Sequence, residues 1–74
     1  MKKAREIHDK IESLLRERGI RPSVYAEAIG MHLYTYYKWK SSISLPSLEL
    51  IYATAKYLGV TVEELVGDDD DGNL

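Results

Sequence analysis

Glycine and proline residues divide this chain into short segments, and this division limits what it can fold into more than any other feature. Apolar residues spaced three and four apart run up to Gly19, Gly30 and Gly59, where helices are expected to end. Pro22 suits the first turn of a helix, where its missing N–H has no partner to lose, and Pro46 closes a loop. No apolar run approaches the roughly 18 residues of a membrane span. The chain is therefore expected to pack several short helices around one core.

The apolar spacing predicts helices over residues 2–18, 22–29, 33–41 and 47–58. A fifth begins at Thr61, which forms a capping box with Glu64, and Val60 and Leu65 stand at the two ends of a hydrophobic staple. The fold class is therefore all-α with five short helices in one domain over 1–67, and an acidic disordered tail is expected over 68–74. The residues expected to line the inward face of these four helices are, in chain order, Ala4, Ile7, Ile11, Leu14, Leu15 and Arg18; Val24, Tyr25, Ala28 and Ile29; Tyr36 and Trp39; and Leu48, Ile51, Tyr52, Ala55 and Leu58.

The composition excludes several classes of protein. The 74 residues include no cysteine, so no disulfide framework or thiolate site can form, and two histidines make a metal site improbable. His8 is expected on the polar face of its helix, without a function. No catalytic set of Ser, His and Asp and no phosphate-binding glycine loop occurs, so we expect no enzyme, no cofactor and no small-molecule substrate. The basic start is not followed by an apolar stretch, which favours a cytoplasmic protein.

The charge is unevenly distributed, although the net value is only −2. Residues 1–40 hold nine basic and five acidic residues, whereas residues 41–74 hold one basic and seven acidic residues. Four of those acids form the run Asp68–Asp71, which is expected to be a solubilising tail. The sequence thus predicts a mildly basic body beside an acidic end.

Several short motifs stand in a fixed order along the chain: Ala26 and Gly30 in the turn, Thr35 and Trp39 in the third helix, Pro46-Ser47-Leu48, and the block Ala55–Leu65. Through these residues the chain resembles, over about residues 3–66, the phage repressor class of helix-turn-helix domains, the lambda and 434 repressor and Cro group of the XRE family. The resemblance implies a lambda repressor-like fold that binds double-stranded DNA with sequence specificity, as a transcriptional regulator and homodimer. Competition of the acidic tail with DNA is an alternative to its solubilising role.

The resemblance also implies which residues contact DNA. In the family, the third helix lies in the major groove, where Lys38 can donate to guanine or phosphate and Tyr34 and Tyr37 can bond bases or phosphates. Pro22 replaces a glutamine that usually touches DNA, and Lys40 stands where glutamate is common. Two or three of Lys2, Lys3, Arg5, Arg16, Arg18 and Arg21 are expected at phosphates. The candidate DNA-binding residues are Arg21, His32, Leu33, Tyr34, Tyr37, Lys38 and Ser41.

A homodimer is expected because one such domain contacts few phosphates and an operator has two-fold symmetry. The candidate dimer surface is the apolar set Tyr57, Val60, Val62, Leu65 and Val66. The alternative function is a protein-interaction module that kept the fold without reading DNA. Pro22, Leu33, Tyr34 and the net negative charge favour this alternative.

Overall fold

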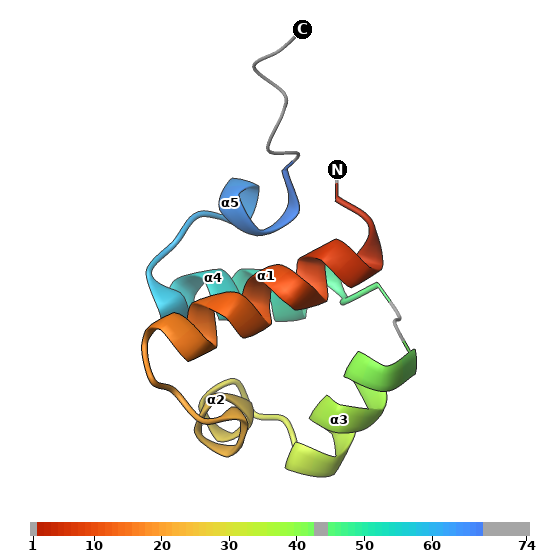
Figure 1. The fold of residues 1–74 in the computed structure, drawn as a ribbon, viewed down its shortest axis with the longest axis vertical. Coiled ribbons are helices and arrows are strands. Elements are labelled where there is room, and N and C mark those ends of the chain that lie inside the picture. The colour runs from red at the N-terminus through yellow and green to blue at the C-terminus, as the bar shows by residue number, and fades with distance from the viewer. Residues whose placement is uncertain (1, 43–44, 68–74) are drawn as a thin grey trace, which may run out of the picture.

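The computed structural model describes residues 2–42 and 45–67, and these ranges contain five helices and no strand (Figure 1). The expected all-α fold class is confirmed. No helix in the described ranges has the length and apolar character needed to cross a membrane. Residues 68–74, expected to be an acidic tail, lie outside the described residues. The helices are α1 Ala4–Glu17, α2 Pro22–Ala28, α3 Leu33–Ser42, α4 Leu48–Leu58 and α5 Val62–Val66.

The helix boundaries follow local chemistry. Gly59 ends α4 in the left-handed region at φ 71°, a conformation that costs glycine little because it has no Cβ. Pro22 is at the first position of α2, as predicted. At Thr61 the predicted capping box is confirmed: the Glu64 N–H donates to Thr61 Oγ1 at 3.0 Å, and the Thr61 N–H donates to Glu64 Oε1 at 3.1 Å. Ser47 caps α4 in the same way, accepting from the Leu50 N–H at 3.2 Å.

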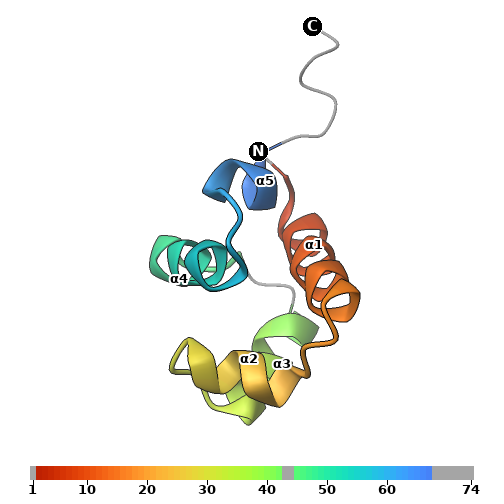
Figure 2. The same ribbon diagram turned by 90° about the vertical axis from the view of Figure 1, so that its left-hand side faces the viewer.

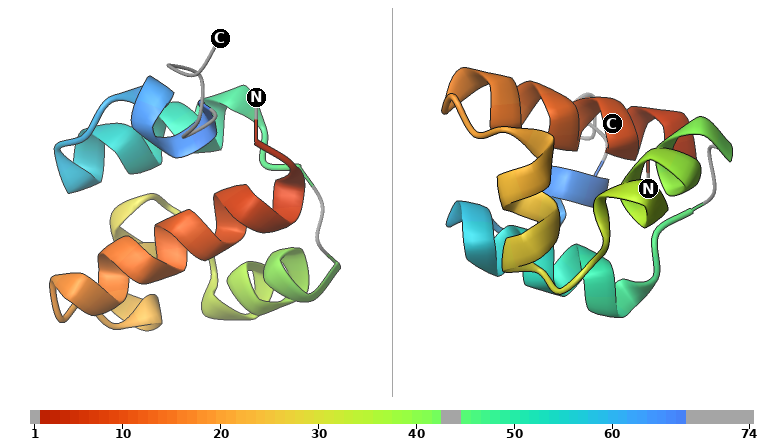
Figure 3. Two further views of the ribbon diagram at one scale, coloured as in Figure 1. Left: turned by 45° about the horizontal axis from the view of Figure 1, so that its top comes forward. Right: turned by 90° about the horizontal axis from the view of Figure 1, so that it is seen from below.

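The helices lie in three levels along the long axis of the molecule (Figures 1 and 2). The two short helices α2 and α3 occupy one end and contact each other across the turn at Gly30. Helices α1 and α4 form the middle, and α5 lies at the opposite end, in contact with both. Figure 3 shows that α3 lies alongside the N-terminal part of α1, so these two helices border a common surface.

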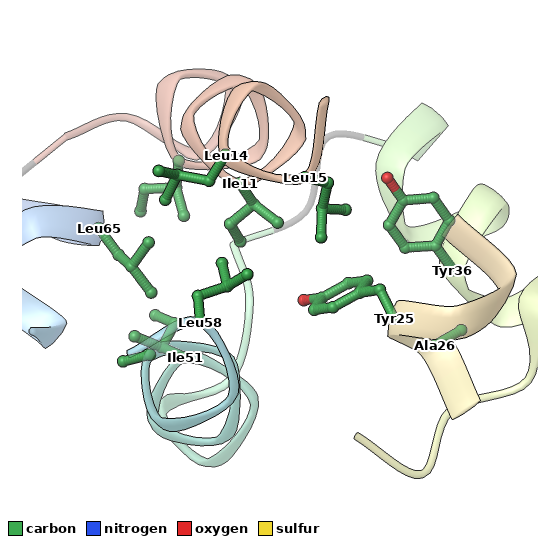
Figure 4. Packing of buried hydrophobic residues seen from close by; sticks show 11 residues of the cluster. Ile11, Leu14, Leu15, Tyr25, Ala26, Tyr36, Ile51, Leu58 and Leu65 are labelled. Atoms are coloured by element: carbon green, nitrogen blue, oxygen red, sulfur yellow. The ribbon is translucent and has the colours of Figure 1, made fainter. Parts of the chain in front are cut away.

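The core lies between the facing sides of all five helices (Figure 4). Tyr25 from α2 reaches into it and its hydroxyl is 2.6 Å from Thr54 Oγ1 on α4; neither residue is exposed at all. A buried hydroxyl needs such a partner, because leaving it unpaired costs free energy. The core cluster comprises Ile7, Ile11, Leu14, Leu15, Tyr25, Ala26, Tyr36, Ile51, Ala55, Leu58 and Leu65.

The predicted inward faces of α2 and α4 were partly wrong. Leu48 and Tyr52 are 76% and 61% exposed, and Thr54 lies inside instead. The pair Leu48 and Tyr52 shows helical spacing of its own, but on the outer side of α4. On α2, Val24 and Ala28 are exposed, because so short a helix meets the core through Tyr25 and Ala26 alone.

Two further side chains, those of His8 and Arg18, lie elsewhere than expected. His8 is buried, not on a polar face, and its ring meets that of Trp39 edge-on with centroids 4.4 Å apart. Trp39 itself is partly buried against the core, which bears out its inward orientation. Arg18 does not follow the apolar stripe of α1; it is exposed and its guanidinium donates to the Leu58 carbonyl.

Lys2 joins the start of the chain to α5. Its backbone N–H donates to the Val66 carbonyl at 2.6 Å, and its ammonium donates to the carbonyls of Gly67 and Glu64. A cation is well placed there, because the C-terminal end of a helix presents unpaired carbonyls and a partial negative charge. Lys2 is one of the six basic residues named for phosphate contact, but it is only 8% exposed and bonds within the fold.

Candidate nucleic-acid interface

One side of α3 carries an exposed stripe of polar and aromatic residues. Tyr34, Tyr37, Lys38 and Ser41 stand three and four residues apart, so they project from the same side of the helix. Tyr34 is 75% exposed and Tyr37 49%, whereas Tyr36 is 3% exposed on the side facing the core. We call the exposed set Tyr34, Tyr37, Lys38 and Ser41 the α3 stripe.

Aromatic contacts and one ion pair hold α3 in place. The Tyr36 ring lies edge-on to Tyr25 at 5.7 Å, and Trp39 meets His8 from α1. The Lys40 ammonium bonds the Glu12 carboxylate, which raises the pKa of Lys40 and lowers the pKa of Glu12. These contacts fix the α3 stripe relative to α1, which is a requirement for a surface that reads a rigid partner.

The α3 stripe forms one wall of a groove of about 650 Å³. The other wall comes from α1, through Arg5, His8 and Asp9, and Lys40 also lines the groove. We call this the α1–α3 groove.

His32 and Leu33 border a different depression. They line a hollow of about 390 Å³ together with Ser23 and Glu27 of α2 and the turn residues Gly30 and Met31. Both side chains are exposed, and Arg21 is exposed at the start of α2. The structure thus brings four of the seven predicted DNA-binding residues together in one groove, and it places His32, Leu33 and Arg21 outside it.

The family of the chain is shown by comparison with known proteins. The model of the helix-turn-helix family matches residues 11–65, which include α2, the turn, α3, α4 and all but the last residue of α5. The chain belongs to the XRE-type helix-turn-helix family. The resemblance drawn from the sequence is therefore confirmed, and α2 and α3 are the two helices of the motif.

A relative of this helix-turn-helix protein has a described role. A stretch of 61 residues, 82% of the chain, is 34% identical to the cryptic phage CTXphi transcriptional repressor RstR of Vibrio cholerae. The chain spans about 55% of that relative's length. No solved structure matches the chain significantly.

One member of the dimer surface predicted for this helix-turn-helix domain is wrong. Leu65 has no exposed area, because α5 turns it into the core, so it is not available to a partner. Val60, Val62 and Val66 are partly buried against the same core, and Tyr57 is 37% exposed with its ring 6.1 Å from that of Tyr25. These four residues remain a prediction.

The sequence reasoning missed the α1 wall of the groove. The sequence predicts Arg5 only as one of six candidate phosphate contacts, and it gives no signal for Asp9. His8 did carry a signal, since it stands three residues before Ile11 and seven before Leu15 on the apolar side of α1. Within the described ranges, no three His, Asp or Glu side chains come together in a way that could hold a metal ion.

Proposed function

We propose that this chain is the sequence-specific DNA-binding domain of a transcriptional regulator of phage or bacterial type, acting in the cytoplasm and without enzymatic activity. The observation that carries the proposal is the α3 stripe: polar and aromatic side chains on the open side of the second helix of the motif. In helix-turn-helix proteins this helix enters the major groove. The RstR relative, described as a transcriptional repressor, supports the same function.

The stripe residues have chemistry suited to base edges and phosphates. Lys38 can donate to guanine O6 and N7 or to a phosphate oxygen. The hydroxyls of Tyr34 and Tyr37 can form hydrogen bonds with base edges or with phosphate oxygens. Ser41 adds a hydroxyl at the far end of the stripe. Leu33 offers an apolar contact to a thymine methyl, and His32 and Arg21 supply contacts at the phosphates flanking the motif.

We further propose that the domain binds as a homodimer on a two-fold operator. A dimer doubles the number of phosphate contacts, and its two α3 helices meet successive turns of one face of the duplex. The proposed contact surface is Tyr57, Val60, Val62 and Val66.

A protein-interaction module is the second candidate. It is favoured by the exposed apolar area of Tyr34 and Leu33 on α3, where a DNA-reading helix commonly has longer polar side chains. Under this alternative, the same residues contact another protein chain and no duplex is bound specifically.

The test is selection from random duplexes followed by binding measurements on variants. We expect wild type to select one operator, and Tyr37→Ala and Lys38→Ala each to weaken its binding. At least one of them should relax the choice at a fixed base position by about 1–3 kcal/mol. Tyr52→Ala and Lys56→Ala are matched controls, since both residues are exposed on α4, outside the stripe.

Helical circular dichroism must be unchanged in every variant for the comparison to hold. A folded Tyr37→Ala/Lys38→Ala protein that binds the operator as tightly as wild type would refute reading by α3. Failure of wild type to bind any duplex would refute the function itself and favour the protein-interaction module.

A further inference from the structure

The second wall of the α1–α3 groove is formed by α1, which lies outside the helix-turn-helix motif of α2 and α3. Arg5, His8 and Asp9 are spaced by three and four residues, so they form one side of the first turns of α1. This side faces the α3 stripe across the groove. A duplex that meets the stripe therefore also meets α1.

The dimensions of DNA determine what α1 would meet. An α-helix with its side chains is about 10–12 Å across, and the major groove is about 12 Å wide, so a helix in the groove fills it. An element packed beside that helix then lies over the sugar-phosphate backbone. Because α1 borders the α3 stripe across the groove (Figure 3), its open side is placed over phosphates.

The charges of the groove agree with this partner. Arg5 and Lys38 stand on opposite walls, and Asp9 is the acid among the lining residues. The Lys40 ammonium is already engaged by Glu12, so its charge is largely compensated within the protein. Arg5 is exposed, and a guanidinium can donate two parallel bonds to one phosphate.

We propose that α1 is a second DNA-contacting element, in which Arg5 binds a backbone phosphate beside the major groove while Asp9, one turn further on, limits the strength of that contact. This inference rests on the proposed function, and it adds to it a contact outside the helix-turn-helix motif. Its effect is on affinity for any sequence, because a phosphate carries no base identity.

The salt dependence of binding tests this assignment. Each phosphate neutralised in duplex DNA adds about 0.9 to the slope of log affinity against log salt. We expect Arg5→Gln to lower the magnitude of the slope by about 0.9 per bound subunit, or about 1.8 for a homodimer, and to weaken binding roughly 5–10-fold per subunit near 0.1 M salt. The selected operator and an unrelated duplex are expected to lose the same factor.

Three companion variants make the result specific. Lys10→Gln removes the same charge from α1 at a partly buried position outside the groove, and it is expected to leave the slope unchanged. Arg5→Lys keeps the charge and is expected to retain the slope while losing part of the affinity. Asp9→Asn removes a negative charge beside the phosphate and is expected to tighten binding to both duplexes.

The outcomes separate this inference from the function on which it rests. Wild type that binds no duplex refutes both. If wild type selects an operator and both Arg5→Gln and Lys10→Gln show the same salt slope as wild type, the α1 contact is refuted and the proposed function stands. An Arg5→Gln protein that loses operator binding but keeps its affinity for the unrelated duplex also refutes it, since Arg5 would then read a base.

Discussion

At the scale of single residues, the hydrogen bond between Tyr25 and Thr54 joins α2 to α4 inside the core. Both residues are fully buried, and their oxygens are 2.6 Å apart. Burial raises the pKa of Tyr25 to about 12, because the ionised phenolate would lose its hydration in the core. Burial raises the pKa of Tyr36 as well. The folded protein therefore holds two tyrosines in their neutral form.

These shifts predict a loss of stability in alkali. Unfolded tyrosine ionises near pH 10, so ionisation of Tyr25 does not change the free energy of unfolding below that pH. It falls as the pH rises from about 10 to 12, because the unfolded chain then releases a proton that folded Tyr25 retains. We expect Tyr25→Phe to reduce this fall, as measured by urea unfolding at a series of pH values. A Tyr25→Phe protein with the full alkaline fall of wild type would contradict the assignment.

At neutral pH the same variant is expected to be less stable than wild type by roughly 1–3 kcal/mol, because Thr54 loses its buried partner. Tyr25→Phe/Thr54→Val removes both polar groups and is expected to recover part of the loss.

At the scale of helices, the boundaries were predictable and the orientations were only partly so. The ends at Gly59 and Thr61 follow from backbone and capping chemistry within a few residues of sequence, so the sequence alone identifies them. The inward side of α4 does not follow from local sequence, because Thr54 is buried only where the hydroxyl of Tyr25 reaches it from α2. The α3 stripe followed from the family and from the spacing of Tyr36. The α1 wall of the α1–α3 groove depends on how α1 packs beside α3, and local periodicity does not predict that packing.

The cap of α5 gives a prediction at this scale. The helix has five residues, too few to persist without its packing and its cap. We expect Thr61→Ala to lower the free energy of unfolding by about 1 kcal/mol, within a range of 0.5–2, because the Glu64 N–H loses its acceptor. Thr61→Ser keeps the acceptor oxygen and is the control. Equal urea midpoints for the two variants would show that the cap contributes nothing.

At the scale of the whole molecule, two apolar faces among the described residues are candidates for self-association. One is the proposed surface at Tyr57, Val60, Val62 and Val66. The other is the outer side of α4, where Leu48 and Tyr52 are the more exposed residues. The sequence indicated only the first face, since it assigned Leu48 and Tyr52 to the core.

Two substitutions to aspartate separate these faces. We expect Val62→Asp to shift the protein toward monomer in sedimentation and to reduce affinity for a two-fold operator, because burying an unpaired charge is costly. The new carboxylate lies in the first turn of α5, where a negative charge is tolerated, and helical circular dichroism checks that the partly buried site still folds. Tyr52→Asp is expected to leave association intact. The reverse pattern would move the dimer contact to α4, and a wild type that stays monomeric at high concentration would exclude a stable free dimer.

The bonds of Lys2 to the end of α5 have a consequence for how the chain order relates to the fold. They hold residue 2 against residues 64–67, so the beginning and end of the helical body are neighbours in space (Figure 2). Neighbouring ends can be joined by a short linker without displacing the helices between them. A circular permutant, linked from Gly67 to Lys2 and opened in the exposed turn at Gly19, would keep every helix whole and present the same groove. The order in which these five helices are synthesised is thus separable from the surface that they build.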